Sequence, residues 1–135
     1  VHEGNYHVLR GKPTSEVLFA LQSHEIRRIA RHEECVFVGR CADFVLRDQD
    51  VKLLTVFVAA PDEHRILRKM TQEKLSRDQA VRLIRKMDKQ RRKYYENYTG
   101  RTWGAPDGYD LYLDTGRLST DEAAACIAAR FREMA

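Results

Sequence analysis

The sequence predicts an α/β fold with a mainly parallel sheet, and two kinds of segment support this. Short apolar runs at 35–38, 53–60 and 110–113 have the length and composition of strands that are buried on both faces. Longer segments with apolar residues at helical spacing alternate with these runs, which is the order of elements in a parallel sheet crossed by helices. With 135 residues, we expect one domain that covers 1–135 and buries a core.

Local start signals place the helices that separate the strands. Thr14 or Ser15 is expected to cap the first helix, and Pro61 with two following acidic residues starts the second. Capping boxes, in which a serine is followed three residues later by Gln or Glu, begin at Ser76 and Ser119. Residues 1–13 are polar and irregular and predict a loop. The predicted helices therefore span about 14–32, 61–73, 77–98 and 120–134.

Composition and charge exclude several classes of protein. Lys and Arg number 24 against 20 Asp and Glu, a surplus of four that fits a phosphate-bearing ligand, a weak nucleic-acid binder or an ordinary mixed surface. No apolar run approaches the ~18 residues of a membrane span, so we expect no membrane association. The three cysteines do not lie in close pairs, which predicts a reducing compartment, the cytoplasm. The sequence contains no set of residues with the spacing of metal ligands, so we expect no metal site.

The first candidate site follows the apolar run at 35–38, in which Cys35 is expected to belong to the core. Gly39 permits a sharp turn at the end of that strand, and ligands of parallel sheets bind beyond such ends. Arg40 presents a planar five-donor cation there, which suits a phosphate. Asp43 is expected to hold Arg40 or to accept from a ligand. A simple Arg–Asp pair that locks the loop remains the alternative.

The second candidate site is the basic helix that begins after Ser76. Eight arginines and lysines crowd its length and the residues just beyond it, and three tyrosines with Trp103 lie at its far end. A phosphate-binding lid is one interpretation, and a surface for single-stranded nucleic acid with base stacking is another. A solvated helix face with a few core aromatics is the third. The basic residues are Arg82, Arg85, Lys86, Lys89, Arg91, Arg92, Lys93 and Arg101.

A third feature is the segment 110–116, where a short strand ends in Asp114 and Thr115. Such a strand end lines the nucleotide pocket of many parallel sheets. It is equally compatible with a turn that precedes the last helix.

Three segments together resemble the cytidylate kinase-like family, a divergent branch of the P-loop nucleoside monophosphate kinases. They are Cys35–Leu46, Met87–Gly100 followed by Trp103-Gly104, and Tyr109–Thr115, and their order and spacing carry the resemblance. It extends from about Ser15 over nearly the whole chain. The fold it implies is a P-loop kinase-like three-layer fold with a mainly parallel sheet.

The activity that the resemblance implies is transfer of the γ-phosphoryl group of ATP to CMP or dCMP, with Mg²⁺. Arg40, Arg91 and Arg92 are then the expected catalytic arginines, and residues 76–104 form the lid. Cys41 stands where ordinary cytidylate kinases have an acid, so Asp43 is expected to substitute for it. The residues expected to bind the monophosphate are Gly39, Arg40, Asp43, Asp88 and Lys89.

One departure from the family pattern is large. No Gly-x-x-x-x-Gly-Lys loop after a first strand occurs in the sequence, and such a loop cradles the β- and γ-phosphates. The resemblance places the missing strand between those at 35–38 and 53–60. Three states are open: a fragment of a complete kinase, replacement of the strand by rearrangement or by a partner chain, or a degenerate relative. We expect a fragment whose 135 residues alone are inactive.

Two other functions compete with the kinase hypothesis. A non-catalytic nucleotide- or phosphate-binding module would keep Arg40 and the lid arginines without the loop. An α/β module that binds nucleic acid through the basic helix is disfavoured by the mild net charge and by the acids interspersed through 62–78. An unpaired sheet edge would favour association into a homo-oligomer.

Overall fold

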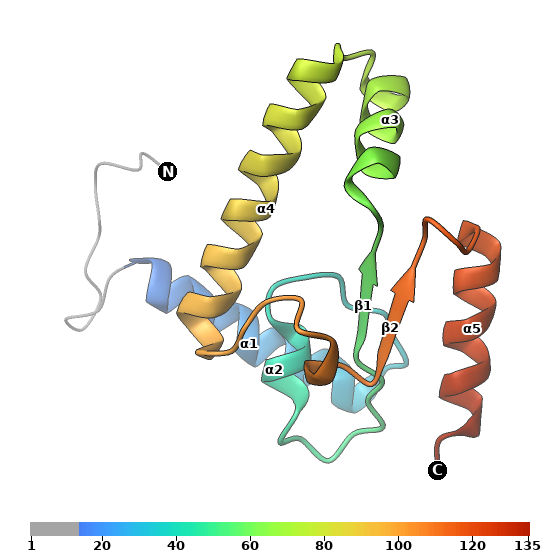
Figure 1. Ribbon diagram of the computed structural model, residues 1–135. Coiled ribbons are helices and arrows are strands. Elements are labelled where there is room, and N and C mark those ends of the chain that lie inside the picture. Colours follow the sequence, from blue (N-terminus) through green and yellow to red (C-terminus); the bar gives the residue numbers. More distant parts are fainter. Residues whose placement is uncertain (1–13) are drawn as a thin grey trace. The chain divides into compact units, whose positions relative to one another are not determined.

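The computed structural model describes residues 14–135, and the described chain divides into two compact units, one up to Leu53 and the other from Leu54. It contains five α-helices, one short 3₁₀-helix (η1) and two strands (Figure 1). This mixed α/β composition agrees with the predicted class. The elements are α1 Thr14–His32, α2 Ala42–Leu46, β1 Val56–Ala59, α3 Asp62–Glu73, α4 Arg77–Thr99, η1 Pro106–Gly108, β2 Leu111–Asp114 and α5 Thr120–Glu133.

The first unit is built on the packing of α1 against α2. Ile26 of α1 is buried together with Val45 and Leu46 of α2, and Phe37 and Leu53 pack around them. The short helix α2 was not expected from the sequence. Thr14 and Ser15 both lie inside α1, and the loop predicted at 1–13 lies outside the described residues.

The strand predicted at 35–38 is wrong. These residues form neither strand nor helix, and the side chains of Val36 and Val38 are 91% and 89% exposed. Cys35, expected in the core, is exposed as well. Within residues 14–135, no strand pairs with this segment, and four apolar residues cannot form a strand without a partner to satisfy their backbone.

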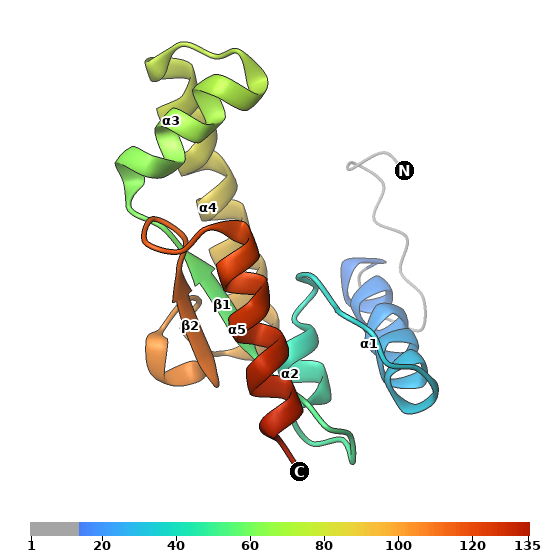
Figure 2. The same ribbon diagram turned by 90° about the vertical axis from the view of Figure 1, so that its right-hand side faces the viewer.

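The second unit contains the sheet, in which β1 and β2 pair in parallel from Val56 opposite Leu111 to Ala59 opposite Asp114. Helices α4 and α5 lie on opposite sides of the strand pair (Figures 1 and 2). This parallel pairing agrees with the mainly parallel sheet that the sequence predicts. Each strand is four residues long, so the run predicted at 53–60 is shorter than expected.

Side chains at the start of the sheet fix the segment between α4 and β2. The Thr55 backbone N–H and hydroxyl both donate to the Asp110 carboxylate, at 2.9 and 3.0 Å. The Phe57 ring is surrounded by Trp103, Tyr109 and Tyr112, with ring centroids 5.1–5.4 Å apart. Gly104 has a left-handed φ of 75°, and a Cβ there would stand 3.0 Å from the Phe57 ring, so glycine is required.

Helices α3 and α4 form a helical hairpin, and the start that the sequence predicts for each of them is confirmed. Lys74 adopts a left-handed conformation that ends α3, and Ser76 opens α4 with a complete capping box. Ile66 of α3 is buried against Ala80 and Ile84 of α4. Among the helices of residues 14–135, none combines the length and the apolar character needed to cross a bilayer.

Candidate functional site

The turn at Gly39 is the candidate site of the first unit, and its backbone is unusual. Gly39, Arg40 and Cys41 have φ angles of 74°, 55° and 57°, three successive left-handed residues. Only Gly39 adopts this conformation at little cost, because the Cβ of the other two crowds the following carbonyl. The Gly39 carbonyl accepts from the Ala42 N–H at 3.2 Å, which closes the turn directly before α2. The predicted sharp turn at Gly39 is confirmed.

Cys41 and Arg40 point in different directions with respect to solvent. Cys41 is 3% exposed, whereas Arg40 lies on the surface. Burial raises the pKa of the Cys41 thiol to about 11, and the nearby Asp43 carboxylate adds to this effect. The thiol is therefore neutral near pH 7 and is no nucleophile. The turn buries its cysteine and presents its arginine, which is compatible with the predicted contact to a phosphate.

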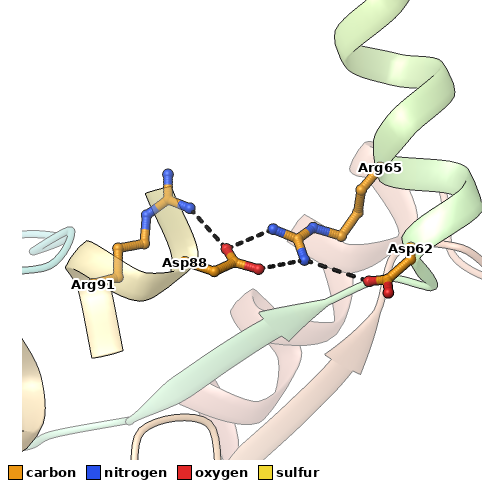
Figure 3. A network of polar contacts seen from close by, with 4 residues as sticks. All are labelled: Asp62, Arg65, Asp88 and Arg91. Atoms are coloured by element: carbon orange, nitrogen blue, oxygen red, sulfur yellow. Dashed lines mark hydrogen bonds and ion pairs between the residues drawn. The ribbon is translucent and has the colours of Figure 1, made fainter. Parts of the chain in front are cut away.

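Asp88 is the centre of the candidate site of the second unit, on the hairpin of α3 and α4. Its two carboxylate oxygens accept from the two terminal nitrogens of Arg65, at 2.7 and 2.8 Å (Figure 3). Arg91, one turn further along α4, donates to the same carboxylate at 3.4 Å. Asp62 lies 3.7 Å from Arg65. The hairpin thus brings two arginines from two helices to one carboxylate.

The four side chains of this network differ in how far they are exposed to solvent. The side chains of Arg65 and Asp88 are 30% and 26% exposed, whereas those of Arg91 and Asp62 are 53% and 88% exposed. The bidentate bond that Arg65 donates to the Asp88 carboxylate raises the pKa of Arg65 and keeps its guanidinium charged. Arg65 is therefore held in place, while Arg91 has a longer bond and more solvent around it.

Arg65 and Asp62 were missed by the sequence reasoning. Arg65 lies 23 residues from Asp88, and nothing in a single sequence pairs the two. A weak signal was available, because Arg65 directly precedes Ile66, which predicts that it lies at the edge of the buried face of α3. Both oxygens of Asp88, which is predicted to bind the substrate, accept from arginines, and its role toward a substrate stays a prediction.

The remaining predicted residues of the basic helix lie in other places. Arg92 stands over the Trp103 ring, with its guanidinium carbon 5.6 Å from the ring centroid, a cation–π geometry. Lys89 is exposed on α4. Arg40 and Asp43 belong to the first unit and Asp88, Lys89, Arg91 and Arg92 to the second. Their roles toward a substrate stay predictions.

The strand end at Asp114 forms a turn. The Asp114 carboxylate accepts from the Gly116 N–H at 2.8 Å, and the Thr115 N–H donates to the Ala59 carbonyl at 2.8 Å. Arg117 lies 3.8 Å from the same carboxylate. This geometry matches the turn that precedes the last helix. Across residues 14–135, no three His, Cys, Asp or Glu side chains gather as a metal site would require.

Comparisons with known proteins place this geometry in context. The model of the cytidylate kinase-like family matches residues 2–117. A crystal structure of an uncharacterized protein from Eubacterium ventriosum superimposes with a TM-score of 0.81 and 27% sequence identity. The match covers 89% of this chain and 75% of that one. A search of curated proteins found no match to the chain.

Proposed function

Because the chain belongs to the cytidylate kinase-like family, we propose that it serves transfer of the γ-phosphoryl group of ATP to CMP or dCMP. The hairpin network carries this proposal: Arg65 and Arg91, from two helices, meet at the Asp88 carboxylate. We also propose that the complete fold is the three-layer fold of P-loop kinases. The lid then comprises α3 with residues 76–104.

The chemistry of phosphoryl transfer supports this assignment. Such transfer asks the protein mainly to position the phosphates and to neutralise their charge. Arg65 is fixed by a bidentate bond and needs no rearrangement to present its charge. Arg91, more exposed and bonded at 3.4 Å, exchanges Asp88 for a phosphate oxygen at lower cost. Asp88 is then a positioning residue rather than a substrate ligand.

ATP and Mg²⁺, which the family implies, are assigned to no residue of this chain. The 135 residues contain no Gly-x-x-x-x-Gly-Lys loop, and residues 14–135 offer no cluster of three metal-binding side chains. In this proposal the chain supplies Arg40 for the monophosphate and the hairpin arginines for the transferred group, and a closed hairpin excludes water.

The test compares the product of the complete natural reading frame with the 135-residue chain. We expect the complete product to form ADP from ATP and Mg²⁺ only when CMP or dCMP is present. We expect the 135-residue chain to bind CMP in a calorimetric titration without turnover. Arg65→Lys keeps the charge but loses the planar fork, so it should lower turnover at least tenfold. Arg68→Lys, at an exposed position of the same helix, is the matched control.

Two results would overturn the proposal. The first is a complete product that consumes no ATP in the presence of CMP, dCMP or other pyrimidine monophosphates. CMP binding together with that inactivity would establish a non-catalytic binding module instead. The second is equal activity of the Arg65→Lys and Arg68→Lys variants, which would remove the hairpin network from the site.

A further inference from the structure

Positive charge is concentrated on α4 to a degree that the whole-chain charge conceals. The helix contains eight Arg and Lys side chains and three acidic ones, a surplus of five. The whole chain has a surplus of only four, so the rest of the protein is slightly acidic. A localised field of this kind attracts polyanions even when the net charge is modest. The mild total charge therefore does not exclude a polyanionic partner.

Five of these cations form one stripe along the helix. Residues 82, 86, 89 and 93 follow at intervals of four, three and four, the spacing of a single helix face, and residue 85 lies beside them. At 1.5 Å per residue, the stripe extends over about 16 Å. We name it the α4 stripe, and all five of its side chains are exposed: Arg82, Arg85, Lys86, Lys89 and Lys93.

The α4 stripe differs from the other charged side of the hairpin in having no acidic partners. Arg65, Arg77 and Arg91 each pair with a carboxylate of α3 or α4, at 2.6–3.4 Å. No residue within 14–135 forms an ion pair or hydrogen bond with a side chain of the α4 stripe. Like charges three and four residues apart destabilise a helix. An external anion would relieve that repulsion.

Most of the α4 stripe lies on a different side of α4 from the residues that pack against α3, and Lys89 is its one member that is also predicted to bind the monophosphate. Ala80 and Ile84 face α3, and Arg82 lies two residues from each of them, which is about half a turn of helix. Tyr94 and Tyr98 pack edge to face against one another, with ring centroids 4.9 Å apart. Neither tyrosine shares the spacing of the stripe, so it offers cations without interleaved aromatic rings.

We propose that the α4 stripe binds the phosphate backbone of double-stranded DNA without reading its sequence. A straight rigid row of cations fits a duplex, which carries about one charge per 1.7 Å of its axis. The lack of aromatic rings disfavours single-stranded nucleic acid, which such proteins hold by stacking its bases. The stripe consists only of cationic side chains, and their electrostatic attraction to phosphates does not depend on base sequence. This function is additional to the proposed phosphoryl transfer.

The test measures the anisotropy of a fluorescein-labelled 20-base-pair DNA duplex during titration with the 135-residue chain. We expect a dissociation constant of about 10⁻⁴–10⁻⁶ M at physiological salt, the range of non-specific binding. With about five phosphates neutralised, the logarithm of affinity should fall against the logarithm of salt with a slope of about −4.5. A single strand of equal length should bind more weakly.

Two double variants with the same change in net charge separate the effect of the α4 stripe on duplex binding from the effect of the overall charge. Lys86→Glu with Lys89→Glu should weaken duplex binding at least tenfold and reduce the salt slope by about two. Arg130→Glu with Arg132→Glu changes the net charge equally at two exposed positions of α5 and should weaken binding less than threefold. Lys86→Gln with Lys89→Gln should give an intermediate loss, which guards against an effect of misfolding.

Three outcomes would overturn the proposal. Absence of duplex binding at 50 mM salt is one, and equal losses in the α4 and α5 variants is another. The third is binding to vesicles that contain phosphatidylserine, dependent on Lys86 and Lys89, without binding to the duplex, because this would identify the stripe as a membrane surface. Phosphotransferase activity is measured separately, so either proposal can fail without the other.

Discussion

Arg40 and Arg65 are both candidate phosphate-binding arginines, but the protein positions them in different ways. Arg40 is placed by its backbone, because three successive left-handed residues form the turn in which it sits. Arg65 lies on an ordinary helix and is placed by its side chain, through the bidentate bond to Asp88. The first device is local in sequence, and the second joins two helices.

The two devices have different costs and different weaknesses. A left-handed residue other than glycine costs roughly 1–2 kcal/mol, so the turn stores strain that the surrounding packing must offset. The hairpin has one left-handed residue, Lys74, at the end of α3 and away from Arg65, but the position of Arg65 depends on one carboxylate. The effect of relaxing the turn on stability should therefore be separable from the effect of losing the Arg40 side chain on binding. Substitution of Asp88 should release Arg65 without touching it.

The largest expected effect concerns Arg40. Arg40→Ala should weaken CMP binding by roughly 1.5–3 kcal/mol, because a hydrogen bond to a charged group is lost. Arg40→Gly should weaken it equally, yet exceed the alanine variant in stability by about 1 kcal/mol, because glycine accepts a positive φ. Calorimetric titration with CMP and thermal unfolding measure the two quantities. Unchanged CMP affinity with lowered stability would show that Arg40 is structural.

The next effect concerns Asp88. Asp88→Ala should lower the free energy of unfolding by about 1–2 kcal/mol, because Arg65 is left half-buried without its partner. Asp62→Ala is the control and should change it by less than about 0.5 kcal/mol, since that carboxylate is 88% exposed. Urea unfolding followed by fluorescence of Trp103, the one tryptophan of the chain, reports on this unit. Equal effects would contradict the central role of Asp88.

Local signals predicted the elements well where the signal and the structure share the same few residues. The capping boxes at Ser76 and Ser119 mark the starts of α4 and α5 as the structure has them. Pro61, followed by two acidic residues, marks the start of α3 in the same way. The turn at Gly39 was expected because glycine permits a left-handed φ. Each of these features is decided within four or five residues of chain.

Non-local features could not be predicted in the same way. The apolar run at 35–38 indicates a strand, but an apolar run says nothing about which strand pairs with it. The ion pair of Arg65 with Asp88 requires two helices to pack in one register, and the sequence separation is 23 residues. The left-handed conformations of Arg40 and Cys41 run against the preference of their residue types, so no propensity indicates them.

The smallest effect, again at the turn, is a loss of stability in alkali. Burial raises the pKa of Cys41 to about 11 from an ordinary value near 9. Below pH 9 the Cys41 thiol is protonated in both the folded and the unfolded chain, so its burial does not make the stability of the turn depend on pH. Between pH 9 and 11 only the unfolded thiol ionises, and the turn should lose about 1 kcal/mol by pH 10. The hairpin contains no cysteine and should not share this loss.

The labelling rate of the Cys41 thiol, measured against pH, reports this local loss of stability. In a variant with Cys35→Ser and Cys126→Ser, Cys41 should react slowly at pH 8 because it is buried. Its rate should rise from pH 9 to 11 more steeply than that of the exposed Cys35 in a matched variant with Cys35 alone. Arg40→Gly, which relaxes the strained turn, should slow Cys41 labelling further. Equal rates for Cys35 and Cys41 at pH 8 would mean that the turn is open, and the backbone would then not be what positions Arg40.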